Sequence, residues 1–186
     1  MLVLASHSPR RREILSNAGI EFVCRPAAVD EKREDGEDSR THVERLAKAK
    51  AMAVDAAPGE IILAADTVVV VDQHVLGKPA TREEAAWMLH RLSGREHEVI
   101  TGICLRSGDR VLVDAETTRV RFVALSEQEI AEYAASGEPM DKAGAYAIQG
   151  LASKFIDRIE GCYFNVVGLP VSLVCRRLRE FSAVSD

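Results

Sequence analysis

Two serines and two arginines stand together near the start of the chain, directly after a short apolar run. With the proline between them they are Ser6, Ser8, Pro9, Arg10 and Arg11. Hydroxyl groups, free N–H groups at a helix N-terminus and guanidinium groups all bind phosphate oxygens, and a proline is well placed in the first turn of a helix. The segment is therefore a candidate polyphosphate site. The alternative is that Ser8 only caps a helix whose arginines face solvent.

A single aspartate interrupts an apolar run in the middle of the chain. Residues 61–71 have the composition of a strand buried on both faces, and Asp66 lies at their centre. A buried carboxylate is costly unless it is paired or faces a cleft. Asp66 is therefore a candidate general base or metal ligand. The alternative, with equal weight, is a structural carboxylate bonded to backbone N–H groups.

Two later segments carry one candidate each. Lys78 lies in a Gly-Lys-Pro tripeptide after a turn expected at 72–73, which would return it toward Asp66 as a phosphate counter-ion. Gln149 lies near the end of the glycine-containing loop 137–150, where its amide can both donate to and accept from a nucleobase edge. Taken alone, each segment is more often a structural turn.

Helices and strands interleave along the chain. Ser/Thr-x-x-Glu pairs, which satisfy the first N–H groups of a helix, predict three helices that begin at Thr41, Thr81 and Ser126. A hairpin turn at 107–109 indicates a mixed sheet. The expected strands cover 2–5, 20–24, 61–71, 96–105, 110–125 and a β-rich run over 145–159, with further helices over 9–17 and 170–181.

The segment 30–40 is dense in charge. Nine of its eleven residues are charged, six acidic and three basic. Such a run buries little apolar surface, so we expect a solvated loop.

Composition excludes several classes of protein. The chain has 186 residues, of which 47% are hydrophobic and 28% are charged, as in a single soluble domain. A net charge of −5 and an aromatic content of 5% argue against a partner that is nucleic acid or an anionic membrane. Four dispersed cysteines without metal-site spacing favour a reducing, cytoplasmic location. No apolar run reaches the length of a membrane span.

Considered together, the motifs resemble one family. They are Leu-Ala-Ser-His-Ser-Pro-Arg-Arg at 4–11, Asp-Glu at 30–31, Ala-Lys-Ala at 49–51, Ala-Ala-Asp-Thr-Val-Val at 64–69, Gly-Lys-Pro at 77–79, Ser-Gly at 93–94, His-x-Val-x-Thr-Gly at 97–102, the loop 137–150 and Asn-Val-Val-Gly-Leu-Pro at 165–170. Their order from first strand to last helix resembles the Maf family of nucleoside triphosphate pyrophosphatases.

The resemblance implies a fold and a reaction. The fold would be α/β, a mixed elongated sheet flanked by helices in two lobes with a central cleft, similar to inosine triphosphate pyrophosphatases, with 1–186 as one domain. The reaction would split a nucleoside triphosphate between its α- and β-phosphates with the help of Mg²⁺ or Mn²⁺. The version of the loop at 141–146 looks like the branch acting on dTTP and UTP, with modified pyrimidine nucleotides as further candidates.

The resemblance also implies roles for individual residues. The residues implied for catalysis and metal binding are Asp66 as general base and metal ligand, Glu31 as an acidic residue near the metal, and the lysines Lys50 and Lys78. The residues implied for substrate binding are Ser8, Arg10, Arg11, Thr67 and Gln149. The expected partner is the nucleoside triphosphate itself, and the chain is compatible with a homodimer.

Three other functions compete with this interpretation. A nucleotide-binding regulator of cell division or septum formation would keep the pocket without turnover, but the intact Asp66, Lys50 and Lys78 favour an enzyme. A nucleic-acid-binding module would need a basic face with stacking aromatic residues. A phosphatase with a covalent aspartyl or cysteinyl intermediate would need a nucleophile motif that the sequence lacks.

Overall fold

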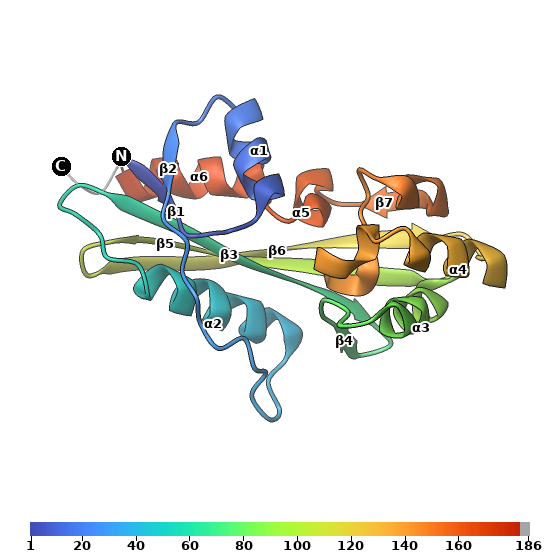
Figure 1. Ribbon diagram of the computed structural model, residues 1–186. Helices are drawn as coiled ribbons and strands as arrows, with labels where there is room; N and C mark the ends of the chain where they lie inside the picture. The colour runs from blue at the N-terminus through green and yellow to red at the C-terminus, as the bar shows by residue number, and fades with distance from the viewer. Residues whose placement is uncertain (183–186) are drawn as a thin grey trace. The chain divides into compact units, whose positions relative to one another are not determined.

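The computed structural model describes residues 1–182 (Figure 1). Its strands form a seven-stranded sheet in the order β2-β1-β3-β5-β6-β7, with β4 paired to β3. The strands are β1 (Leu2–Leu4), β2 (Phe22–Cys24), β3 (Ile61–Val71), β4 (His74–Leu76), β5 (Glu96–Ser107), β6 (Arg110–Phe122) and β7 (Ile156–Glu160). The helices are α1 (Pro9–Asn17), α2 (Ser39–Met52), α3 (Arg82–Leu92), α4 (Glu127–Ala135), α5 (Tyr163–Val167) and α6 (Val171–Ser182).

The mixed sheet that the sequence predicts is confirmed. Strand β1 runs parallel to both β2 and β3, whereas β4 pairs antiparallel with β3, and β7 pairs antiparallel with β6. The β3–β4 turn uses Asp72 and Gln73 with φ of 47° and 66°. Two consecutive residues with positive φ are typical of a tight hairpin whose twist matches its strands.

Two of the three predicted helix starts are confirmed. Thr81 caps α3 and Ser126 caps α4, the latter with a complete capping box. The start expected at Thr41 is wrong, because Asp38 caps α2 by accepting hydrogen bonds from the backbone N–H groups of Arg40 and Thr41 at 3.0 and 3.1 Å. A carboxylate three residues upstream is a good cap and lengthens the helix by a turn.

The β-rich run expected over 145–159 is wrong for most of its length. Three 3₁₀ turns occupy Glu138–Asp141, Ala143–Ala145 and Leu151–Phe155, and only Ile156–Glu160 is a strand. Gly144 and Ala145 have positive φ, which takes the backbone out of the extended conformation that strand pairing requires. Several apolar side chains of this run, such as those of Tyr146, Ala152 and Phe155, are thus buried without sheet pairing.

The chain divides into two compact units. The first unit contains residues 1–67, 101–116 and the chain from Gly168, and the second contains 68–100 and 117–167. The first core contains many small residues, such as Ala5 just after β1, Ala47 on α2 and Ala64 on β3. The second core is larger and aromatic, with Phe122 and Tyr146 among its buried residues.

Helix α2 of the first unit lies directly on β5. A Cβ atom placed on Gly102 would be 2.5 Å from both the carbonyl carbon and the oxygen of Val43, so only glycine permits this approach. The contact seats the helix that carries Lys50. Among residues 1–182, no helix is both long and apolar enough to cross a membrane.

Candidate active site

A lysine and two carboxylates meet in the first unit. Asp66 lies on β3 and Lys50 on α2, and each residue is 8% exposed. The Nζ atom of Lys50 lies 2.6 Å from Asp66 Oδ1 and 2.6 Å from Glu31 Oε1. Glu31 comes from the loop before α2, and its side chain is 54% exposed. The structure therefore brings three of the implied site residues together, with Glu31 and Asp66 on the ammonium group of Lys50.

This arrangement explains the aspartate in an apolar strand. Buried charges require partners, and Lys50 supplies one for Asp66. Two carboxylates around one ammonium group leave a net charge of −1, which a further cation can neutralise. The alternative was that backbone N–H groups bond to Asp66. Its hydrogen bond comes instead from the side chain of Lys50 on α2.

The serines before α1 organise the start of that helix. Ser8 is the N-cap, and its hydroxyl accepts from the backbone N–H of Arg11 at 3.4 Å. The backbone N–H of Ser8 in turn donates to the hydroxyl of Ser6 at 3.2 Å. Capping is therefore one role of Ser8, and it is compatible with a second role toward a ligand. Arg10 follows and is half-buried.

Arg11 points inward, and its guanidinium donates hydrogen bonds to other residues of the first unit. Its guanidinium donates to the carbonyls of Gly168 at 2.8 Å and Ala65 at 2.7 Å. It also donates to the hydroxyls of Ser6 at 3.3 Å and Thr67 at 3.1 Å. Burial lowers the pKa of Arg11, and the charge of Asp66 raises it; an arginine stays charged under such shifts.

These contacts tie α1, β3 and the segment before α6 together at one point. Thr67 lies next to Asp66, and its hydroxyl is 2.9 Å from that of Thr101 on β5. Sequence reasoning placed Ser6 in the candidate polyphosphate segment but assigned no individual role to Thr101 or Gly168. In the sequence Thr101 is only a threonine in an expected strand. A sequence also cannot show that the backbone carbonyl of Gly168 accepts a hydrogen bond from a distant residue.

Lys78 and Gln149 belong to the second unit, and both are exposed. The loop 137–150 is joined to the Gly-Lys-Pro turn, because the N–H of Gly144 donates to the carbonyl of Gly77 at 3.0 Å. A Cβ atom on Gly144 would lie 2.7 Å from Cγ2 of Val69, so the glycine is needed for this close packing. The two segments that carry the candidates are thus neighbours within this unit.

Aromatic side chains hold the same loop. His97 on β5 is 2% exposed, and its Nε2 lies 2.8 Å from the hydroxyl of Tyr146. The hydroxyl of Tyr133 donates to Glu138 at 2.8 Å and accepts from the N–H of Ala147 at 3.1 Å. Burial lowers the pKa of His97 to about 3, so the ring is neutral at physiological pH.

The donor set of the first unit fits a divalent cation that shares its ligands with a substrate. Mg²⁺ and Mn²⁺ prefer oxygen ligands, and Mg²⁺ is commonly held by one or two carboxylates together with phosphates and water. Glu31 and Asp66 provide two such carboxylates. Within residues 1–182 no group of three or more His, Cys, Asp or Glu side chains is placed to hold a metal ion. The residues therefore suit a metal ion that is bound jointly by the protein and the substrate, and not one bound by protein side chains alone.

Comparison with known proteins decides the family. The family described as Maf-like protein matches residues 1–181. The chain belongs to the Maf family. A relative from Symbiobacterium thermophilum named dTTP/UTP pyrophosphatase is 54% identical over 97% of this chain and 93% of its own length. One from Koribacter versatilis with the same name is 51% identical over 96% and 93%.

Solved structures support the fold of this Maf protein. The Ham1 protein of Staphylococcus aureus has a TM-score of 0.52 at 12% identity, covering 96% of this chain and 98% of its own. A HAM1 protein from Coxiella burnetii has a TM-score of 0.51 at 16% identity, with the same coverage. At such low identity, the likeness extends to the fold alone. The predicted mixed α/β architecture is confirmed.

Proposed function

We propose that this Maf protein is a nucleoside triphosphate pyrophosphatase that converts dTTP and UTP to the monophosphate and pyrophosphate. The observation that carries the proposal is the buried Asp66 held by Lys50, one residue from the Arg11–Thr67 contact. Two relatives that are 54% and 51% identical over nearly the whole chain bear the name dTTP/UTP pyrophosphatase. The activity would remove these triphosphates from the nucleotide pool.

Asp66 is the proposed general base. Lys50 contacts its Oδ1 atom, which leaves Oδ2 for the attacking water. The water adds to the α-phosphorus, its proton passes to the carboxylate, and the bond between the α-phosphorus and the bridging oxygen breaks. Pyrophosphate carries away the electron pair of that bond. A positioned base of this kind contributes about 10²- to 10⁴-fold in rate.

Cations are needed because the attacked group is a polyanion. Lys50 places one buried positive charge beside Asp66, and preorganised charge of this kind stabilises charge that develops in the transition state. We assign Glu31 and Asp66 as the residues that would hold Mg²⁺ or Mn²⁺. The ion, when bound, would neutralise phosphate oxygens and favour ionisation of water.

The remaining residues would bind the substrate. Ser8, Arg10 and the N–H groups of α1 form the proposed phosphate loop. Arg11 has a supporting role in this proposal, because most of its donors are already bonded to the protein. Lys78 is assigned to phosphate oxygens, while Thr67 and Gln149 are assigned to the nucleoside end.

Pyrimidine preference is assigned to hydrogen bonding at the base. Thymine and uracil share an edge of acceptor, donor and acceptor, whereas cytosine presents an amino donor and an acceptor nitrogen at two of these positions. An amide matched to uracil therefore mismatches cytosine. Each buried unsatisfied partner costs about 1 to 3 kcal/mol, which is enough for a clear preference.

The proposed location is the cytoplasm. All four cysteines, Cys24, Cys104, Cys162 and Cys175, are free thiols. Proteins of reducing compartments keep such thiols, whereas secreted proteins commonly pair them.

A substrate panel tests the proposal. The purified protein is incubated with Mg²⁺ or Mn²⁺ and with dTTP, UTP, CTP or a purine triphosphate in turn, and the products are separated. We expect monophosphate and pyrophosphate, fastest from dTTP and UTP. Diphosphate and orthophosphate would contradict the assigned bond. Tight nucleotide binding without turnover would instead support a regulator.

A further inference from the structure

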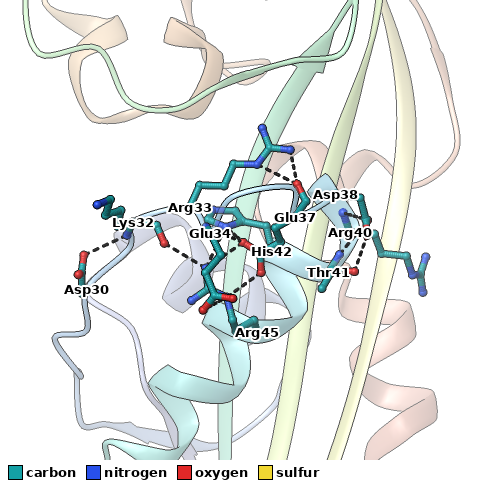
Figure 2. A network of polar contacts seen from close by, with 10 residues as sticks. All are labelled: Asp30, Lys32, Arg33, Glu34, Glu37, Asp38, Arg40, Thr41, His42 and Arg45. Carbon is teal, nitrogen blue, oxygen red and sulfur yellow. Dashed lines mark hydrogen bonds and ion pairs between the residues drawn. The ribbon is translucent and has the colours of Figure 1, made fainter.

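The charged segment 30–38 before α2 is bonded to that helix through the buried side chain of Glu37 (Figure 2). Most of residues 30–36 are exposed, as expected of a solvated loop, but the side chain of Glu37 is only 5% exposed. Its carboxylate lies 2.6 Å from Nε of Arg45 and 2.9 Å from Nδ1 of His42. A second oxygen of the same carboxylate accepts from Nη2 of Arg45 at 2.9 Å.

The hydrogen bonds from Arg45 are the main reason that the pKa of Glu37 is lowered to about 2. The carboxylate is therefore ionised throughout the physiological pH range. A bidentate contact between a guanidinium and a carboxylate is among the strongest side-chain contacts and has a defined geometry. It restricts both the end of the loop and the first turns of α2.

The same arginine also reaches back to the neighbourhood of Glu31. Nη2 of Arg45 donates to the carbonyl of Lys32 at 3.0 Å, one residue after Glu31. Asp30 precedes Glu31, and its carboxylate accepts a hydrogen bond from the backbone N–H of Lys32 at 3.0 Å. The N–H of Glu34 donates to Glu37 at 3.3 Å. The backbone that carries Glu31 is thus tied to the arginine on α2.

Helix α2 therefore contacts the loop at two places. Lys50 near its end holds the carboxylate of Glu31, and Arg45 holds the backbone beside it. A single ion pair to a side chain that is 54% exposed contributes little, because water screens it. The buried contact of Arg45 with Glu37 is better suited to fix the loop.

We propose that Glu37, His42 and Arg45 are positioning residues that present Glu31 to Lys50 and to the divalent cation of the reaction. The proposal rests on the function assigned above, because it takes Glu31 as a metal-binding group. In this role the three residues act through the loop that bears Glu31 and not by direct contact with substrate or metal ion. Their loss should weaken the use of the metal ion more than turnover at saturating metal.

The test compares Arg45→Gln with Arg40→Gln. Arg40 lies on the same helix, but its ion pairs go to Glu44 and Asp114 and not to the loop. For Arg45→Gln we expect a roughly tenfold rise in the Mg²⁺ concentration that gives half-maximal dTTP hydrolysis, with kcat at saturating Mg²⁺ within about threefold of the wild type. Arg40→Gln should leave the metal dependence unchanged. Equal metal dependence in both variants would overturn the proposal.

A double-mutant cycle shows whether Arg45 acts through Glu31. If it does, Arg45→Gln adds nothing to the metal requirement of a Glu31→Gln protein. Additive effects of the two changes would contradict the positioning role. Arg45→Lys serves if Arg45→Gln does not fold, because lysine keeps the charge without the two-pronged contact. It should give an intermediate metal requirement, and wild-type behaviour would count against the proposal.

Two further readouts do not depend on turnover. Amide hydrogen exchange of residues 32–36 should quicken in Arg45→Gln relative to the wild type, and Mn²⁺ binding followed by electron paramagnetic resonance should weaken. If the wild type hydrolysed no triphosphate, the proposed function would fail while exchange still tested the anchoring. Unchanged exchange and Mn²⁺ affinity in an active enzyme would overturn the positioning role alone.

Discussion

The charged centre of the first unit and the loop 137–150 of the second are held by different forces. Lys50 binds Glu31 and Asp66 through ion pairs at 2.6 Å. The loop is held by rings, with the centroids of Phe122 and Tyr146 4.9 Å apart in an edge-to-face arrangement. His97 on β5, which contacts Tyr146 of this loop, is neutral because burial lowers the pKa of its ring.

The difference indicates which property each region supplies. Removal of one member of a buried ionic group leaves the other charges unpaired at the place where reaction chemistry needs them. Removal of an aromatic ring leaves a cavity and loosens the loop that carries Gln149. Substitutions in the charged centre should therefore change the rate, and those in the aromatic residues around the loop 137–150 should change stability and selectivity.

The largest effect is expected from Asp66→Asn. The amide oxygen can still accept from Lys50, but an amide is not a base, so kcat should fall by about 10²- to 10⁴-fold. Nucleotide affinity should change little. Steady-state kinetics and a nucleotide titration measure the two quantities, with Asp109→Asn on the exposed β5–β6 turn as the control. Near-full activity in a folded Asp66→Asn protein would make this carboxylate structural.

Gly102→Ala should affect stability and rate together. The new methyl group would lie 2.5 Å from the backbone of Val43, so α2 must shift and carry Lys50 with it. Overpacking of this kind costs about 1 to 3 kcal/mol. Chemical denaturation and kcat measure the outcome.

Gly108→Ala is the matched control for that change. Its methyl group would meet open space, but its φ of 56° is strained for alanine, which costs roughly 1 to 2 kcal/mol. It should lower stability while leaving kcat unchanged. Equal kcat in the two variants would show that the packing of α2 on Gly102 does not affect catalysis.

His97 should make the protein sensitive to acid. Its pKa is about 3 in the folded chain and 6.5 in the unfolded chain, so the unfolded chain binds the proton first as pH falls. The resulting stability is present above pH 6.5 and declines toward pH 3, by about 2 kcal/mol between pH 7 and pH 5. In His97→Gln the free energy of unfolding should fall less over the same interval. Parallel pH profiles for the two proteins would remove His97 as the cause.

The smallest effect is expected from Gln149→Ala. Loss of one hydrogen-bonding amide at the base should reduce the ratio of kcat/KM for dTTP to that for CTP by about tenfold. Gln128→Ala, on the surface of α4, is the control for a glutamine outside the loop. An unchanged ranking of dTTP, UTP, CTP and GTP would remove Gln149 from base selection.

Local patterns in the sequence predict much of this structure. The run 61–71 is strand β3, the proline at position 9 begins α1, and Asp72 and Gln73 form the expected turn. Each of these depends on neighbours in the chain. Asp66 stands out for the same reason, because a charge in an apolar strand is visible without knowledge of its partner.

Features that depend on distant residues could not be predicted in this way. The pairing of Lys50 with Asp66 crosses from a helix to a strand, and nothing in the local pattern around Lys50 indicates it. The inward turn of Arg11 depends on the carbonyl of Gly168, 157 residues away. The segment 145–159 has strand-like composition, but the positive φ of Gly144 and Ala145 sets turns there instead.

The most direct test of the central claim is a single turnover of dTTP in ¹⁸O-labelled water. If the first unit directs water at the α-phosphorus, the label appears in dTMP, the pyrophosphate stays unlabelled, and Asp66→Asn forms labelled dTMP at least a hundredfold more slowly. Label in pyrophosphate, or in orthophosphate released with dTDP, would contradict the account.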